Sequence, residues 1–235
     1  MRKPLAIIPA RGGSKRIPRK NIKHFLGRPI IEYSINSAIE SQLFEEVMVS
    51  TDDFEIAEIS RNAGASVPFL RSKNKADDFT GTAEVLMDVV NQYKTLGRVF
   101  QTVCCIYPTA PFITSKFLKS SFSKFENSNC DSLFPILQFD SPIQRALIQN
   151  ANGKLEMKFP ENYSLRSQDF QPCYHDAGQF YWVKVESLEK YGKLWMINSE
   201  GIVISQLQAQ DIDTLEDWKI AEWKYSLVNN SNYDV

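Results

Sequence analysis

Short apolar runs alternate with amphipathic helical patterns along most of this chain, and no other feature constrains its fold as strongly. The runs typical of buried strands lie at 5–9, 44–50, 67–70, 102–107, 132–137, 180–185 and 202–207. Apolar residues recur at helical spacing within 31–39, 56–59, 86–96, 118–125 and 215–225. Repeated strand-helix units of this kind predict an α/β fold with a doubly wound, mainly parallel sheet.

One segment, 139–180, breaks this alternation. It is rich in Pro, Gln, Asn and Ser with aromatic residues between them, so we expect an inserted lobe of loops and short strands. A lobe of this type often builds a substrate site or a dimer contact. Because 235 residues suit one α/β domain, we expect 1–235 to form a single domain that carries this lobe. In the run before the lobe, Pro135 favours an edge strand or a bulge.

The overall charge is nearly balanced, but its distribution is not. Lysine and arginine number 27 against 28 acidic residues, so the net charge of -1 gives no general electrostatic argument for a nucleic-acid partner. Every charged residue before Glu32 is basic, whereas one late stretch contains Asp211, Asp213, Glu216 and Asp217. This asymmetry indicates a phosphate site near the start of the chain and a metal site near its end.

The 4 cysteines lack the spacing of metal ligands. Cys104 and Cys105 are adjacent in an apolar run, where a strand would direct their side chains to opposite faces. We expect these two, with Cys130 and Cys173, to be unpaired thiols in a reducing compartment. The start of the chain lacks a signal-peptide core, and no run reaches the length of a membrane span. We therefore expect a cytoplasmic protein without a membrane partner.

The segment ARGGSKRIPRKN, residues 10–21, directly follows the first buried run. Open parallel sheets place their ligand crevice at such a position. The glycines at 12 and 13 allow turns that bring backbone N–H groups close to an anion, and Arg11, Lys15 and Lys20 could surround a triphosphate. The letters fit neither a Walker P-loop nor the G-x-G-x-x-G dinucleotide fingerprint. A solvated basic turn is the alternative interpretation.

A pair of acids stands just ahead of the last helical pattern. Asp211 and Asp213 alternate along an extended segment, so both carboxylates can face one side. Two carboxylates suit Mg²⁺, which also takes water and substrate phosphates as ligands. Alternatively, Asp213 only caps the last helix, and Glu216 completes a capping box.

Polar residues also follow the third and fourth apolar runs. Arg71 comes after the third run, and Asp78 and Thr82 precede the helical pattern at 86–96. The fourth run ends in YPTAPF, residues 107–112, where Thr109 could contact a base or a ribose. Helix capping and a rigid strand-to-helix connection are the structural alternatives here.

The string IPARGGSKRIPRKN, residues 8–21, resembles the amino-terminal signature of the CMP-nonulosonic acid synthetases, the acylneuraminate cytidylyltransferase family. The resemblance covers essentially the whole chain and implies a Rossmann-like nucleotidyltransferase fold, CTP as substrate and Mg²⁺ as cofactor. It implies that Arg11, Lys15 and Lys20 act catalytically by holding the CTP phosphates, and that Asp211 and Asp213 bind the metal. The nucleotide-binding residues that it implies are Ala10, Arg11, Gly12, Gly13, Ser14, Lys15, Asn21, Arg71, Asp78, Thr82, Pro108 and Thr109.

Three strings, DSPIQRAL, RSQDFQP and YHDAGQFYW, resemble the pseudaminic acid branch of this family. The sialic acid branch lacks HDAGQFYW and usually has glutamine where this chain has Tyr107. The sugar-binding residues that the resemblance implies are Gln144, Arg145, Arg166, Gln168, His175, Asp176 and Gln179.

The activity that this resemblance implies is transfer of CMP from CTP to the anomeric hydroxyl of a nine-carbon acidic sugar, with release of pyrophosphate. It also implies a homodimer in which the neighbour's lobe completes the sugar pocket. N-acetylneuraminate and legionaminate are the alternative sugars. A non-catalytic nucleotide- or RNA-binding module is a more distant alternative, which the balanced charge of the chain disfavours.

Overall fold

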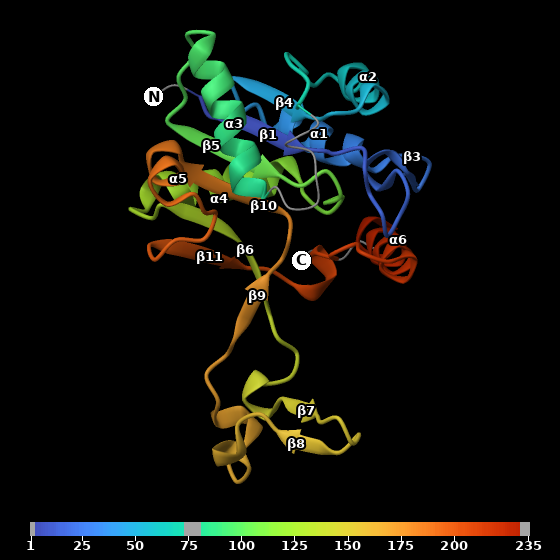
Figure 1. Cartoon of the computed structure of the whole chain (residues 1–235), viewed down its shortest axis with the longest axis vertical. Coiled ribbons are helices and arrows are strands. Elements are labelled where there is room, and N and C mark those ends of the chain that lie inside the picture. Colours follow the sequence, from blue (N-terminus) through green and yellow to red (C-terminus); the bar gives the residue numbers. More distant parts are fainter. Residues whose placement is uncertain (1–2, 73–80, 231–235) are drawn as a thin grey trace.

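A seven-stranded sheet forms the centre of the molecule in this computed structural model, which describes residues 3–72 and 81–230 (Figure 1). Its strands are β1 (Leu5–Pro9), β4 (Glu46–Ser50), β5 (Thr102–Ile106), β6 (Ser132–Gln138), β9 (Tyr174–Asp176), β10 (Phe180–Lys184) and β11 (Ser199–Val203). The order across the sheet is β11-β6-β10-β5-β1-β4, and β9 pairs with the far end of β6.

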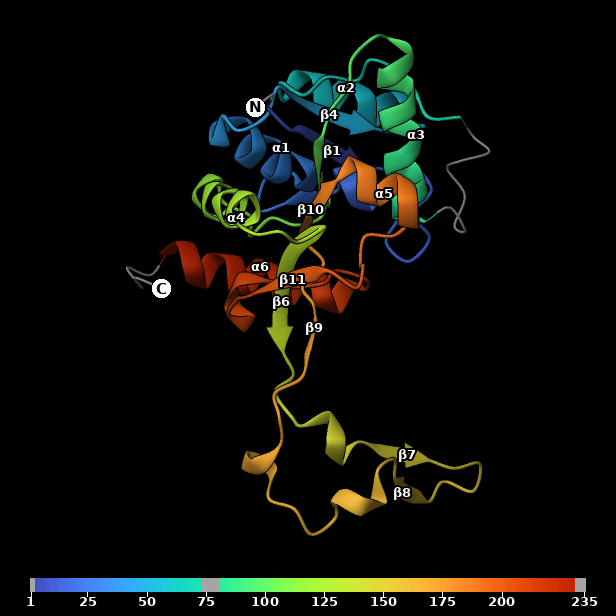
Figure 2. The same ribbon diagram turned by 90° about the vertical axis from the view of Figure 1, so that its left-hand side faces the viewer.

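Helices cover both faces of this sheet (Figures 1 and 2). The helices α1 (Ile30–Ser41), α2 (Phe54–Asn62) and α4 (Ser115–Asn127) lie on one face, and α3 (Thr82–Thr95) and α5 (Val185–Tyr191) lie on the other. The last helix, α6, spans Leu215–Asn230. The predicted doubly wound α/β class is therefore confirmed.

The direction of β10 makes the sheet mixed. β1 runs parallel to β4 and β5, and β11 runs parallel to β6, but β10 is antiparallel to both of its neighbours, β5 and β6. A strand order in which β10 separates β5 from β6 cannot be read from apolar runs alone, because such runs carry no direction.

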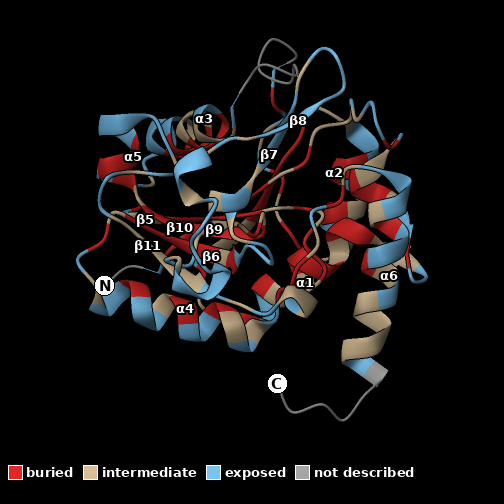
Figure 3. Cartoon of the chain, turned by 90° about the horizontal axis from the view of Figure 1, so that it is seen from below, coloured by how far each residue is buried: buried red, intermediate tan, exposed pale blue. Residues whose placement is uncertain are grey.

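Side chains alternate between the two faces as expected for strands. Along β1, Leu5 and Ile7 pack in the core against α3, while Ala6 and Ile8 pack in the core against α1. Cys104 and Cys105 in β5 also divide between these two cores, which confirms their predicted opposite orientation. Figure 3 shows the buried residues gathered on the sheet and on the inner sides of the helices.

Two predicted strands differ from the structure. The run at 67–70 forms no strand. Ser66 makes an isolated bridge to Met48, and this pairing does not continue because Pro68 offers no backbone N–H. The run at 202–207 belongs to a strand only as far as Val203. Ser205 then begins a 3₁₀ turn (Gln206–Gln208) that a capping box with Gln208 stabilises.

Pro135 lies in a strand inside the sheet and not at its edge. β6 pairs with β10 at Ser132 and Leu133, and with β9 from Ile136 onward. Pro135 lies between the residues of β6 that pair with β10 and those that pair with β9, so its missing N–H interrupts neither of these two ladders.

The predicted lobe extends away from the body of the molecule (Figures 1 and 2). Its elements are the 3₁₀ turns Ile143–Arg145, Pro160–Asn162 and Ser167–Asp169 and the hairpin of β7 (Leu147–Gln149) and β8 (Leu155–Met157). All of residues 138–176 are described, and none of them is buried. The chain rejoins the sheet at β9, slightly before the predicted end of the lobe.

The first loop of the chain folds against its last helix. After β1 come a 3₁₀ turn (Lys20–Ile22) and the small hairpin β2 (His24–Phe25) and β3 (Arg28–Pro29). Phe25 packs with Trp218 of α6 at a ring distance of 5.7 Å, and Ile17 and Ile212 join the same cluster. Within the described ranges, no helix is long and apolar enough to cross a membrane.

Candidate active site

A cavity of about 500 Å³ opens at the carboxyl ends of β1 and β5. Its walls are Pro9, Arg11, Ser14, Lys15, Arg16, Lys20, Asn21, Arg71, Thr82, Val85, Tyr107, Pro108 and Thr109. All three predicted phosphate-holding cations and most of the predicted nucleotide-binding residues are among them. Ala10, Gly12 and Gly13 do not line this cavity, and Asp78 lies outside the described residues.

Backbone contacts hold the start of the first loop. Ala10 is buried, and its N–H donates to the carbonyl of Ser50 at 2.9 Å. The side chain of Asn21, also buried, donates to the carbonyl of Arg11 at 2.9 Å. Asn21 therefore fixes the backbone that carries Arg11.

Gly12 behaves differently from the sequence-based prediction. Its N–H donates to Oδ1 of Asp52 at 3.0 Å, so a carboxylate of the protein itself occupies this donor. A Cβ at position 12 would lie 2.7 Å from Oδ2 of Asp53, and this close approach requires glycine here. A Cβ at position 13 would meet no described heavy atom within 4 Å, so no such constraint acts on Gly13.

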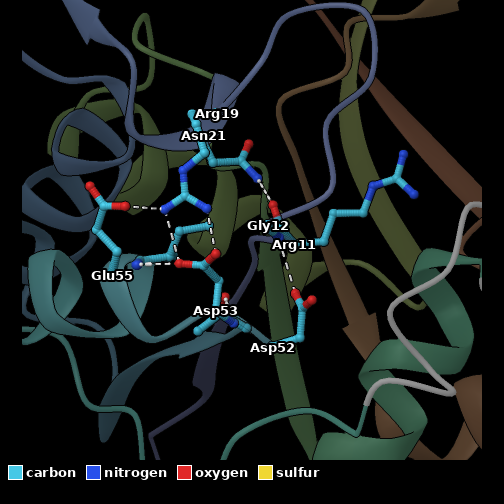
Figure 4. A network of polar contacts seen from close by, with 9 residues as sticks. Arg11, Gly12, Arg19, Asn21, Asp52, Asp53 and Glu55 are labelled. Atoms are coloured by element: carbon cyan, nitrogen blue, oxygen red, sulfur yellow. Dashed lines mark hydrogen bonds and ion pairs between the residues drawn. The ribbon is translucent and has the colours of Figure 1, made fainter.

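Arg19 points away from the cavity, although it belongs to the same basic segment. Its guanidinium pairs with both carboxylate oxygens of Asp53 and with Glu55 at 2.5 Å (Figure 4). The hydrogen bond from Arg19 holds the pKa of Asp53 below its ordinary value. Sequence reasoning missed Asp52 and Asp53. The signal for them was their position directly after β4, the strand beside β1.

The acidic segment near residue 212 contacts two cavity residues of the first loop, although neither Asp211 nor Asp213 itself lines the cavity. The Nζ of Lys20 donates to the carbonyl of Ile212 at 2.5 Å and lies 3.5 Å from Oδ1 of Asp213. Arg16, another cavity residue, has Nη1 2.7 Å from Oδ2 of Asp213. Partial exclusion of water and the nearby charge of Asp213 raise the pKa of Asp211, and the charge of Lys20 partly offsets this effect.

The capping alternative for Asp213 is wrong. The side chain of Thr214 accepts from the N–H of Asp217 at 3.2 Å, and Asp217 accepts from the N–H of Thr214 at 2.8 Å. These reciprocal bonds make Thr214 and Asp217 the capping pair of α6, and Glu216 takes no part. Asp213 is therefore not needed for the helix start.

The acidic pair can be tested as a metal site by its donor set. The described residues contain no group of three or more His, Cys, Asp or Glu side chains arranged to hold a metal ion. The Asp211 carboxylate accepts no hydrogen bond from residues 3–72 or 81–230. Two hard carboxylates near the predicted phosphate-holding cations fit Mg²⁺, which completes its shell with water and substrate phosphates.

Arg71 and Tyr107 also line the cavity. Arg71 is buried and donates to Ser50 through Nε at 3.2 Å and Nη2 at 2.6 Å. Burial lowers the pKa of Arg71, and the charge of Asp52 acts against this shift. The Tyr107 hydroxyl lies 3.5 Å from Oγ1 of Thr82, and burial raises the pKa of Tyr107.

None of the predicted sugar-binding residues lines this cavity within one chain. Gln144, Arg145, Arg166 and Gln168 lie in the lobe, which extends away from the sheet (Figure 2). Arg145 donates to the carbonyl of Leu165, and Gln144 donates to that of Gln171 at 3.2 Å. These four side chains are therefore separated from the predicted phosphate-holding cations of their own chain.

The three predicted sugar residues near β9 hold local structure. The ring of His175 lies tilted against that of Phe139, with 4.8 Å between the ring centroids. Asp176 accepts from the N–H of Gly178 at 2.8 Å and from the Tyr181 hydroxyl. Gln179 is 3% exposed and donates to the carbonyl of Gln208 at 2.5 Å, so its amide is packed inside the protein.

Comparison with known proteins agrees with this arrangement. A family profile described as cytidylyltransferase matches residues 5–160, which include the first loop, Arg71 and the turn after β5. This chain belongs to the cytidylyltransferase family.

Relatives of this cytidylyltransferase include two sugar-specific enzymes. A pseudaminic acid cytidylyltransferase of Campylobacter jejuni is 39% identical over 98% of this chain and 100% of its own length. A CMP-N,N'-diacetyllegionaminic acid synthase of Legionella pneumophila is 28% identical over 93% of this chain and 94% of its own length.

A solved structure resembles this cytidylyltransferase in fold. It is a CMP:2-keto-3-deoxy-manno-octonic acid synthetase in complex with CTP, with a TM-score of 0.71 and 15% identity over 97% of this chain and 100% of that one. This likeness supports the nucleotidyltransferase fold that the first loop implied.

Proposed function

We propose that this cytidylyltransferase transfers CMP from CTP to the anomeric hydroxyl of pseudaminic acid. The observation that carries the proposal is that Arg11, Lys15 and Lys20 line one cavity and that Lys20 also contacts Ile212 and Asp213 of the acidic segment. The pseudaminic acid relative, aligned over its full length, supports the choice of sugar.

The reaction needs the triphosphate held for in-line displacement. The anomeric oxygen of the sugar attacks the α-phosphorus of CTP, and the bond from that phosphorus to the bridging oxygen breaks. The hydroxyl loses its proton, and pyrophosphate leaves. Arg11, Lys15 and Lys20 would hold the phosphates and offset the charge that develops on the leaving group. Catalysis by this chain is thus mainly positioning and electrostatics.

Asp211 and Asp213 would hold Mg²⁺ next to these cations. When bound, the ion supplies positive charge that polarises the phosphate oxygens and neutralises the pyrophosphate. The contact of Lys20 with Ile212 and Asp213 sets the two carboxylates beside the loop that holds the phosphates. In this arrangement Lys20 has two tasks, because it serves both the nucleotide and the acidic segment.

The nucleoside would contact the cavity residues that follow β5 and begin α3. Arg71, Thr82, Tyr107 and Thr109 line the cavity and offer hydrogen-bond donors and acceptors. Tyr107 has a fixed position, because its ring packs on Tyr181 at 5.5 Å and its hydroxyl lies near Thr82. A rigid polar wall of this kind suits recognition of a base and ribose.

The enzyme would act as a homodimer in which the lobe of one chain reaches the cavity of the other. Two observations support this proposal. The lobe contains no buried residue, and it exposes apolar side chains that include Leu147, Ile148, Leu155 and Tyr163. It also carries Gln144, Arg145, Arg166 and Gln168 away from its own cavity, where they could read the carboxylate and amides of a partner-bound sugar.

We also propose a cytoplasmic location. The enzyme consumes CTP, a cytoplasmic nucleotide, and all of its cysteines are free. Cys104, Cys105 and Cys130 are buried, and Cys173 is partly exposed. Unpaired thiols are expected in a reducing compartment.

The substrate can be tested by incubating the enzyme with CTP, Mg²⁺ and one sugar at a time and measuring pyrophosphate. We expect pseudaminate to give a kcat/KM at least about 100-fold above that of N-acetylneuraminate or legionaminate, because unmatched polar groups in a hydrogen-bonding site are costly. A preference for another of these sugars would change the proposed substrate and leave the proposed reaction, CMP transfer from CTP, unchanged. Absence of pyrophosphate with all three sugars would contradict the proposal.

A further inference from the structure

We propose that Asp52 and Asp53 are positioning residues that hold the first loop in its CTP-binding conformation, Asp52 through the N–H of Gly12 and Asp53 through Arg19, which is not a phosphate ligand. The proposal rests on the proposed function of that loop and adds to it the residues that shape it. Both acids follow β4 directly, at the edge of the sheet where β1 ends. None of the three side chains lines the cavity.

Asp53 fixes the loop through Arg19. The Nη2 of Arg19 lies 3.0 Å from Oδ1 of Asp53, and Nη1 contacts the other oxygen, a paired geometry that only a guanidinium provides. The same Asp53 caps helix α2 by accepting from the N–H of Ile56 at 3.0 Å. The loop is therefore fastened to the beginning of a helix.

Arg19 directly precedes Lys20, so its ion pair with Asp53 fixes the backbone next to Lys20. Arg19 has a φ of 56°, a left-handed conformation that is uncommon for a residue with a side chain. It precedes the 3₁₀ turn that contains Lys20 and Asn21, both of which face the cavity. Pairing with Asp53 compensates for the unfavourable backbone angle and so keeps Lys20 directed toward the triphosphate site.

Asp52 fixes the loop at a second point. Its Oδ1 accepts from the N–H of Gly12, directly after Arg11. In Figure 4 the side chain of Arg11 extends away from this contact and from the Arg19 group. The negative charge of Asp52 also favours the charged form of the buried Arg71, whereas the charge of Arg11 opposes it. Asp52 thus holds the backbone at Gly12, and its negative charge offsets the positive charge of Arg71 before an anionic ligand binds.

These contacts divide the basic residues of the first loop into two groups. Arg11, Lys15 and Lys20 line the cavity, while Arg19 is turned to the acids at the end of β4. We call the contacts of Asp52 with Gly12 and of Asp53 with Arg19 the brace. A loop already fixed in this conformation loses less conformational entropy when CTP binds, so loss of the brace should weaken nucleotide affinity. The sugar contacts other parts of the protein and should be affected little.

The test is calorimetric measurement of CTP binding without sugar, together with KM for each substrate and the melting temperature. We expect Asp52→Ala and Arg19→Ala to weaken CTP binding about 10- to 100-fold, to change the sugar KM less than about threefold, and to melt within a few degrees of the unmodified enzyme. Asp52→Asn should restore most of the affinity, because its amide oxygen still accepts from Gly12. Glu58→Gln, on the exposed side of α2, is the matched control and should bind CTP normally.

Two further variants separate a brace from a phosphate ligand. Arg19→Lys keeps the charge but cannot form the paired contact, so it should lose as much affinity as Arg19→Ala. Asp53→Asn combined with Arg19→Ala should bind CTP no more weakly than Arg19→Ala alone, because the two changes remove one interaction.

Opposite results would overturn the proposal. Normal CTP affinity in Asp52→Ala and Arg19→Ala would show that the brace is dispensable, and full retention of affinity in Arg19→Lys would make Arg19 a charge acting on phosphate. If the variants also raised the sugar KM by a similar factor and lowered the melting temperature by many degrees, the acids would serve only the general stability of the protein. Failure of the unmodified enzyme to bind CTP at all would instead refute the proposed function on which this inference rests.

Discussion

Lys20 and Asp213 form an ion pair of 3.5 Å between the first loop of the chain and the segment before its last helix. The same Lys20 donates to the carbonyl between the two acids, at Ile212. The distance matters because a cation for phosphate and a carboxylate for a metal ion must converge for phosphoryl transfer. Two segments at opposite ends of the sequence thus form one site.

Replacement of Lys20 tests its double role. We expect Lys20→Ala to lower kcat/KM for CTP by at least about 100-fold, because the phosphates lose a charge and the acidic segment loses its anchor. Lys23→Ala is a suitable control, since Lys23 lies over the ring of Trp218 at 5.6 Å and not in the cavity. Pyrophosphate release at varied CTP measures both variants. A Lys20→Ala enzyme within about fivefold of normal would contradict the assignment.

The acidic pair is tested by magnesium titration. Asp211→Ala and Asp213→Ala should each nearly abolish turnover, by about 100-fold or more, and no concentration of Mg²⁺ should restore the normal rate. Glu216→Ala, on the same segment but outside the capping pair, should remain close to normal. Near-normal magnesium-dependent rates in either aspartate variant would refute its role as a ligand.

Mixed dimers test whether one chain's lobe serves the other chain's cavity. We expect Lys20→Ala and Arg166→Ala to be nearly inactive alone. Co-expressed in equal amounts, they should recover about a quarter of the normal activity, because half of the dimers are mixed and each mixed dimer has one intact site. Two lobe variants combined in the same way are the control and should stay inactive. Lack of recovery in the first mixture would place the whole sugar site within one chain.

Glu46 provides a prediction about stability and pH. Burial acts to raise its pKa, but hydrogen bonds from Ser66, Tyr93 and Arg98 outweigh this effect and lower the pKa. Glu46→Gln should therefore lose about 1–3 kcal/mol of unfolding free energy at pH 7. Since the folded-state pKa is lowered, this contribution is complete above the ordinary pKa of glutamate and disappears as the pH falls through the folded-state value.

The measurement is chemical denaturation of Glu46→Gln and the unmodified protein from pH 7 down to about pH 3, below the ordinary pKa of glutamate. The difference in unfolding free energy should stay constant near neutrality and narrow at the acidic end. Glu45→Gln, which removes an exposed partner of Arg98, should cost less than about 1 kcal/mol and serves as the control. A difference that widens on acidification would contradict the sign of the shift.

Local patterns were sufficient to predict much of this molecule. The first loop and the YPTAPF turn follow buried strands, and strand ends on one edge of a sheet meet in space, so Arg11 and Thr109 could be placed together from sequence. The capping of α4 by Thr114 was also readable, because its side chain bonds the N–H of Phe117, three residues later.

Long-range pairing was not readable in the same way. Arg19 and Lys20 are adjacent basic residues, and only the fold shows that one pairs with Asp53 while the other faces the cavity. The direction of β10 and the orientation of the lobe also depend on contacts between distant segments. The string that contains Gln179 did not predict that its amide Nε2 donates to the carbonyl of Gln208, a contact that tertiary packing creates.

The order of strands in the sheet has a consequence for how the chain folds during synthesis. β1, β4 and β5 can pair as soon as they leave the ribosome, but β6 pairs only with β9, β10 and β11, all of which are made later. Nascent chains that end between residues 138 and 174 therefore carry the unpaired, mostly apolar strand Ser132–Gln138. Truncation of the gene within this interval would leave an aggregation-prone half-sheet, not a smaller working enzyme.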